Sequence, residues 1–289
     1  MAGEFIPTIW SKLILESLKK ILVAMQITNQ DWEGDISEYG DTVRIFTPGP
    51  VTSKPYTPDV DIAAPETPTD IETNLVIDQM DYFNFKINDI LNRQSAAQRT
   101  GSYIDEATYA LRDTIDQFLL SFYTDVATEN ITNPVGSGVL VTTSNIYTLF
   151  SEMYRRLTDS KNPTEGRYAV VSPVIMEVIQ GYFAGRQTDF GDNASMDGSV
   201  GKFAGFDIFL SHNVPVVVES LTGTGDQNVN KCLIGRKIGL TFAAQIPAGS
   251  LERYRPEKRF EDAIKGLSLY GAKMLRSGAS NGLINLAVD

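Results

Sequence analysis

The stretch SYIDEATYALRDTIDQFLLSFYTDVA, residues 102–127, is the part of the chain that decides the fold. Its apolar residues recur every three or four positions and so share one stripe of an α-helix; they are Ile104, Ala107, Leu111, Ile115, Phe118, Phe122 and Val126. Ser102 is the predicted N-cap, and Asp105 and Glu106 fall in the first turn, where the helix dipole favours negative charge. At ~1.5 Å per residue this helix would be roughly 39 Å long, which is long for a globular domain.

Two stretches before this helix alternate in polarity on either side of a proline-rich segment. Residues 40–46 place Val43 and Ile45 between polar neighbours, and a second stretch alternates through Phe83, Phe85 and Ile87. The six prolines at positions 48, 50, 55, 58, 65 and 68 cannot donate to a sheet ladder. We therefore expect residues 40–87 to form a long two-stranded arm, with a disordered loop as the alternative. An isolated ribbon is marginal in water, so the arm should lie against another surface.

The remainder of the chain predicts short helices and strands in alternation. Residues 7–27 place Trp10 on the apolar face of an amphipathic helix. Further helices are expected at residues 144–157 and 174–183, and strands at 168–171, 205–211, 231–245 (two strands) and 267–275. No repeat of 20–50 residues is visible, which argues against a solenoid or a propeller. This pattern predicts an α+β fold.

The composition excludes several classes of protein. Of 289 residues, 42% are hydrophobic and 21% charged, which is typical of a folded globular protein. Cys232 is the single cysteine, so the chain has no internal disulfide, and its β-prone neighbours Lys231, Leu233 and Ile234 predict a buried, inert thiol. The first 27 residues carry too many charges for a membrane span or a signal peptide, and no membrane association is expected.

Catalytic and nucleic-acid-binding patterns are nearly missing from the sequence. The net charge is −11 without a basic cluster, which argues against tight binding to phosphates. His212 is the only histidine, and no zinc-protease, nucleophile-elbow or P-loop motif occurs. Asp189, Asp192 and Asp197 lack the spacing of an EF-hand. We expect no enzyme activity, no cofactor and no metal; the alternative, an acidic two-carboxylate hydrolase, rests only on the number of acidic residues.

Four segments, taken in order, resemble the major capsid proteins of tailed double-stranded DNA bacteriophages, the family with the Hong Kong 97-type fold. They are FIPTIWS at residues 5–11, GDTVRI at 40–45, GKFAGFDIFLSHNVP at 201–215 and RFEDAIKGLSLYGAKML at 259–275. The resemblance implies an N-terminal arm (1–39), an extended loop (40–87) and a peripheral domain built on a long spine helix (88–133). An axial domain (134–249) follows, and residues 250–289 supply a return strand of the peripheral domain and a C-terminal tail.

The implied function is a shell subunit that forms hexamers and pentamers and encloses the phage genome as part of the virion capsid. Assembly is expected in the host cytoplasm, with a separate scaffolding protein because no scaffolding domain is evident before residue 5, and with a portal protein and packaged DNA that is not read by sequence. A nanocompartment shell that encloses an enzyme is the alternative with the same fold. The residues expected at contacts between subunits are Trp10, Tyr56, Phe83, Phe85, Arg253, Arg255 and Arg259.

Overall fold

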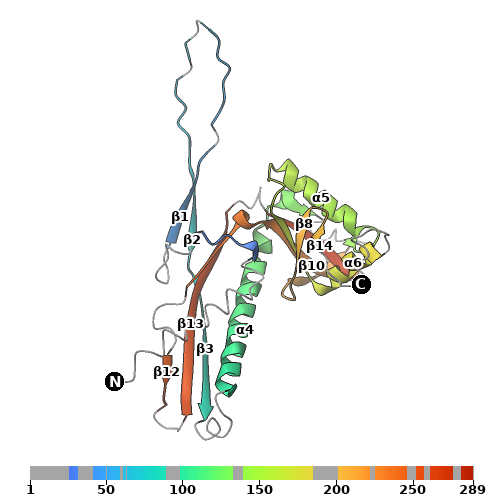
Figure 1. Ribbon diagram of the computed structural model, residues 1–289. Helices are drawn as coiled ribbons and strands as arrows, with labels where there is room; N and C mark the ends of the chain where they lie inside the picture. The colour runs from blue at the N-terminus through green and yellow to red at the C-terminus, as the bar shows by residue number, and fades with distance from the viewer. Residues whose placement is uncertain are drawn as a thin grey trace.

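The computed structural model describes residues 26–31, 42–49, 51–58, 61–62, 64–88, 98–132, 139–184, 201–221, 225–245, 252–256, 261–275 and 281–288. It confirms a mixed helix-and-sheet fold with three parts (Figure 1). The arm comprises the described residues within 42–76. The long-sheet lobe comprises those within 79–121, 240–254 and 261–274. The compact lobe comprises those within 128–236 and 281–288.

The arm begins as a two-stranded ribbon. β1 (Thr42–Thr47) pairs antiparallel with β2 (Ile71–Val76), from Thr42 opposite Val76 to Thr47 opposite Ile71. The described residues between these strands contain no further strand, as the prolines predict, and the loop extends far from the two lobes (Figure 1).

The strand that follows the arm has a different partner from the one predicted. Phe83 and Phe85 lie in β3 (Gln79–Asn88), but β3 pairs over its ten residues with β13 (Glu261–Met274) and not with β1. The prediction of one ribbon over residues 40–87 is therefore wrong, and its ladder ends at Val76. Alternation in a sequence fixes which face a side chain occupies, but it does not identify the partner strand.

β13 is the centre of the long-sheet lobe. It also pairs antiparallel with β11 (Leu240–Gln245) and β12 (Glu252–Tyr254), which completes a four-stranded sheet. The helix α4 (Gln98–Ser121) runs beside this sheet (Figure 1), and the ring of Phe118 meets that of Tyr270 edge to face, with centroids 5.3 Å apart. The lobe is therefore a helix packed against a long, twisted sheet.

α4 is the predicted long helix, but its boundaries differ from the prediction. It starts four residues before Ser102, so Ser102 is not the N-cap and its first turn contains no acidic residue. Its end is a 3₁₀ turn, η2 (Phe122–Asp125), after which Val126 is extended. Gln98 and Arg99 favour helix strongly enough to carry it through Gly101, whose cost is only about 1 kcal/mol.

The compact lobe contains an eight-stranded mixed sheet in the order β4-β14-β10-β6-β8-β7, with β5 on β14 and β9 on β10. The long strands are β10 (Gly225–Arg236) and β14 (Asn281–Val288), and the others are β4 (Ile131–Thr132), β5 (Val139–Leu140), β6 (Arg167–Val171), β7 (Lys202–Phe203), β8 (Phe206–Leu210) and β9 (Val216–Leu221). α5 (Ile146–Asp159) and α6 (Pro173–Ala184) pack with this sheet, and a short 3₁₀ turn occurs at η3 (Thr128–Asn130). A second 3₁₀ turn, η4 (Lys237–Gly239), lies between β10 and β11.

The last described residues form the strand β14 and not the C-terminal tail that was expected. It lies inside the sheet, antiparallel to β10 and parallel to β4 and β5. Ile284, Leu286 and Ala287 are fully buried, and so is Asn281 at its start. Asn281, Gly282 and Asn285 interrupt the apolar run, which is why the segment does not have the alternation of a half-buried strand.

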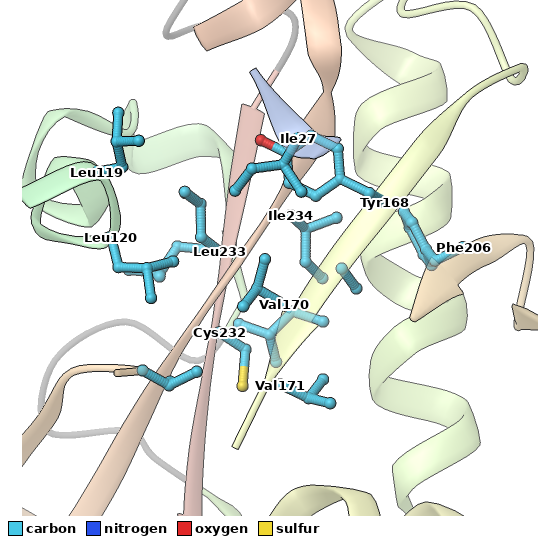
Figure 2. Close-up of a cluster of buried hydrophobic side chains, with 14 of the residues drawn as sticks. Ile27, Leu119, Leu120, Tyr168, Val170, Val171, Phe206, Cys232, Leu233 and Ile234 are labelled. Carbon is cyan, nitrogen blue, oxygen red and sulfur yellow. The ribbon is translucent and has the colours of Figure 1, made fainter. Parts of the chain in front are cut away.

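A single hydrophobic core joins the two lobes. Leu119 and Leu120 of α4 lie close to Leu233 and Cys232 of β10 (Figure 2). Ile27 belongs to the same core. The backbone of Asn29 is hydrogen-bonded to β11: its N–H donates to the carbonyl oxygen of Leu240 at 2.8 Å, and its carbonyl oxygen accepts from the N–H of Phe242 at 2.9 Å. The core fixes the two lobes relative to each other because densely packed interiors resist displacement.

The arm has its own, smaller core at its root. Ile45, Leu75 and Ile77 pack with Ala243 and Leu269, away from the main core. Gly271 of β13 permits this packing, because a Cβ there would lie 2.2 Å from the carbonyl oxygen of Val76. The arm therefore leaves the long-sheet lobe at a point where two backbones touch.

Replacing Gly271 with alanine should lower the free energy of unfolding by about 1–3 kcal/mol, since backbone atoms must move to admit the methyl group. Urea unfolding monitored by circular dichroism measures the change. Gly201→Ala is the matched control, because a Cβ at Gly201 meets no atom within 4 Å. Equal stability of the two variants would contradict the close approach at Gly271.

Candidate assembly surfaces

The described part of the arm exposes large apolar side chains. Tyr56 is 71% exposed, as the prediction of an intersubunit contact requires, and Val51 and Ile62 are exposed to a similar degree. Phe46 and Ile71 extend this exposed set to the ribbon at the root. Apolar side chains gathered on an extended segment favour contact with another surface, at ~25 cal/mol for each Å² of apolar area removed from water.

The two limbs of the arm touch beyond the ladder of β1 and β2. The hydroxyl of Thr52 donates to one carboxylate oxygen of Glu66 at 3.2 Å, and the N–H of Thr52 donates to the other at 3.3 Å. At Gly49 a Cβ would lie 2.1 Å from the carbonyl oxygen of Thr69, so the backbones are in direct contact there. These contacts hold the limbs together in a segment where proline prevents a regular ladder.

Phe83 and Phe85 do not form an exposed surface. Their rings stack with centroids 5.9 Å apart, and Phe85 lies 5.9 Å from the ring of Tyr103 on α4. Both rings pack against the main core of their own chain. The opposite face of β3 instead exposes Met80 and Tyr82, which occupy the alternate positions.

The charged residues near β12 and β13 pair within the chain. Arg253 contacts the carboxylate of Asp262, Lys265 lies 2.8 Å from Glu252, and Lys86 lies 3.0 Å from Glu261. The carboxylate of Glu252 raises the pKa of Lys265, chiefly through the hydrogen bond between them. Arg253 was predicted to pair with a neighbouring subunit, but Asp262 of its own chain already balances its charge. Arg255 is exposed, whereas Trp10 and Arg259 lie outside the described residues.

Two cations, Arg167 and Lys231, are buried among the described residues of the compact lobe, and their burial is not evident from the sequence. The guanidinium of Arg167 donates to the carbonyl oxygens of Tyr154, Asn162 and Pro163 and to the hydroxyl of Thr158, at 2.6–3.1 Å. It therefore satisfies carbonyls in the last turns of α5 and in the loop that follows. The ammonium of Lys231 on β10 contacts Glu219 on β9 and donates to Asn285 on β14 at 3.1 Å. The second group links three strands, and sequence spacing cannot reveal such a long-range pair.

Cys232 is fully buried, as predicted, and burial raises the pKa of its thiol to about 12. The thiolate is the reactive species, so the native chain should not react with Ellman's reagent at pH 8, whereas the chain in concentrated guanidinium chloride should release one equivalent. Rapid reaction of the native protein would contradict the burial of this residue.

The remaining residues considered for metal binding or catalysis are His212 and three aspartates. His212 lies on an exposed turn, and no group of three or more potential metal ligands occurs among the described residues. Asp189, Asp192 and Asp197 lie outside them. None of the described helices is long and apolar enough to cross a membrane.

The fold is similar to that of solved bacteriophage structures. A structure from Mycobacterium phage Che8 is 22% identical, with a TM-score of 0.71 over 91% of this chain and 90% of that one. The capsid structure of cyanophage P-SCSP1u is 19% identical, with a TM-score of 0.68 over 91% and 86%. The capsid of Ralstonia phage GP4 is 12% identical, with a TM-score of 0.70 over 91% and 87%.

Comparisons with protein-family models and with curated proteins find no match. The likeness in structure covers nine-tenths of the chain, so it establishes the overall fold. The chain has the mixed helix-and-sheet fold of phage capsid structures.

Proposed function

We propose that this chain is the major capsid protein of a tailed double-stranded DNA phage, a shell subunit with the Hong Kong 97-type fold. The observation that carries the proposal is the exposed apolar arm on a body whose fold matches capsid structures over nearly its whole length. Such an arm gains free energy by lying on another molecule. In a shell built from one protein, that molecule is a neighbouring copy.

We assign a role to each part of the structure from the same similarity to capsid structures. The long-sheet lobe with its spine helix α4 is the peripheral domain, the compact lobe is the axial domain, and residues 42–76 are the extended loop. We place contacts between subunits at Tyr56 and, replacing Phe83 and Phe85, at Met80 and Tyr82 of the exposed face of β3. Trp10, Arg255 and Arg259 remain predicted contacts. The contacts are heterologous, which suits closed hexamers and pentamers.

The proposed partners follow from a shell that is filled with a genome. They are a separate scaffolding protein, a portal protein and packaged double-stranded DNA that is not bound by sequence. Co-expression with the scaffolding protein, followed by gradient sedimentation, tests the proposal. Fast-sedimenting particles of uniform size are expected. A slowly sedimenting species alone would contradict the proposal, and co-purifying enzyme cargo would favour a nanocompartment.

The free subunit should not bind double-stranded DNA measurably at physiological salt, because its net charge is −11 and DNA binding requires clustered cations. An electrophoretic mobility shift assay at several salt concentrations tests this. A shift that weakens as salt increases would contradict the expectation and indicate a basic surface on the subunit.

A further inference from the structure

β9 is an edge strand of the compact lobe. It follows the turn after β8 and pairs antiparallel with β10, from Val216 opposite Asn230 to Leu221 opposite Gly225. Within the described residues, β10 is its only strand partner. Its second edge therefore has no ladder in the part of the chain that the structure describes, and such an edge can accept a further strand.

The hydrogen-bond pattern identifies the groups on that open edge. The N–H of Lys231 donates to the carbonyl oxygen of Pro215 at 2.8 Å, so position 215 faces β10. In an antiparallel pair the inward and outward positions alternate along the strand. The N–H and C=O groups of Val216, Val218 and Ser220 consequently point away from β10, toward the open edge.

The exposed side chains of this strand are uncharged, and two of the three are apolar. Val216 is 54% exposed and Val218 is 64% exposed, and Ser220 is exposed beside them. Exposed Asp226 and Asn228 lie opposite on β10 and give the pair of valines a polar rim. An apolar centre within a polar rim is the usual composition of a protein interface.

The strand also lacks the features that normally protect an edge. Proteins block exposed edges with charged side chains, proline or bulges, but residues 216–221 read VVVESL and contain neither lysine nor proline. Glu219, the one charged residue, turns inward and is neutralised by Lys231. The pairing with Lys231 therefore neutralises the one charge that β9 itself carries. The exposed charge opposite the strand is Asp226 on β10, at the rim.

We propose that the β9 edge (Val216, Val218 and Ser220) is a contact surface for a second copy of this chain, made through main-chain hydrogen bonds and packing of the two valines. The inference rests on the proposed shell function and specifies one of its contacts. A second copy is the favoured occupant because each chain carries a net charge of −11, and a strand whose own exposed side chains are uncharged lets two such chains approach with little repulsion. A ring also requires a surface besides the arm, since a heterologous contact joins two different patches.

Hydrogen exchange of the wild-type chain, free and in assembled particles, tests the contact without any substitution. The amides of Val216, Val218 and Ser220 should exchange at least roughly tenfold more slowly in the particles than in the free chain. Equal exchange rates in well-formed particles would overturn the inference and leave the shell function intact. Failure of the wild-type chain to form any particle, with or without scaffolding protein, would instead count against the proposed function and, with it, against this contact.

A substitution gives a second, independent measurement. Val218→Lys places a charge on the edge and should reduce the yield of particles at least roughly tenfold, while the melting temperature of the free chain changes little. Val174→Lys, at an exposed valine on the helix α6, is the matched control and should assemble normally. Normal assembly of Val218→Lys, or an equal loss with Val174→Lys, would overturn the inference. If Val218→Lys does not fold, hydrogen exchange of the wild-type chain decides.

Discussion

Replacing Lys231 with methionine should lower the free energy of unfolding by about 3–5 kcal/mol, as expected when one partner of a buried ion pair is removed. The side chains of Lys231 and Glu219 are only 4% and 7% exposed, so the carboxylate would remain in the interior without a counter-charge. Its Oε2 atom has no hydrogen-bond partner among the described residues, which leaves Lys231 as the main source of stabilisation. Urea unfolding of the unassembled chain, monitored by circular dichroism, measures the loss.

The double variant Lys231→Met with Glu219→Leu separates a buried charge from a simple packing defect. Removing both charges should restore most of the lost stability, because well-packed apolar residues often replace a buried ion pair at little cost. A double variant less stable than Lys231→Met alone would contradict this account. A loss below about 1 kcal/mol in the single variant would do so as well, since it would mean that water reaches the pair.

Replacing Val51, Tyr56 and Ile62 together with serine should reduce the yield of assembled shells at least roughly tenfold without unfolding the subunit. Full burial of one such side chain contributes about 1.5–3 kcal/mol, and the contact recurs at every subunit of a shell. All three side chains are exposed within their own chain, so the free energy of unfolding should change by no more than about 0.5 kcal/mol. Sedimentation measures assembly, and circular dichroism measures folding.

The control for the arm is Thr57→Ser, an exposed arm position that keeps its polar character. It should assemble as the wild type does. Unchanged assembly of the triple serine variant would show that the arm is not the contact that holds the shell together. Loss of folding in that variant would show that the arm packs on its own chain.

The strongest sequence signals were those that depend on nearby residues. The three-and-four spacing of Leu111 and Ile115 correctly predicted a helix with those residues buried. The spacing did not predict the burial of Leu119 and Leu120. At this end of α4 both lobes contribute to the core, so the helix is buried on more than one face. The prediction of Ser102 as the N-cap was wrong for a similar reason. A serine close to two acidic residues is a local pattern that can also occur inside a longer helix.

Features set by distant residues could not be predicted. β3 alternates as an arm strand would, and only the ladder with β13 shows where it belongs. Val216 to Val218 form a β-branched run that would have predicted β9, but the edge position becomes visible only through the pairing with β10. Of the predicted contact residues, Tyr56 is exposed on the arm, whereas Phe83 and Phe85 pack against the main core of their own chain.

Negative-stain electron microscopy of the expressed chain, alone and with its scaffolding partner, tests the shell function most directly. The account predicts closed shells or tubular assemblies tens of nanometres across, which the triple serine variant of the arm should fail to form. A homogeneous small particle under both conditions would contradict it, because a chain that buries its arm without neighbouring copies is not a shell subunit.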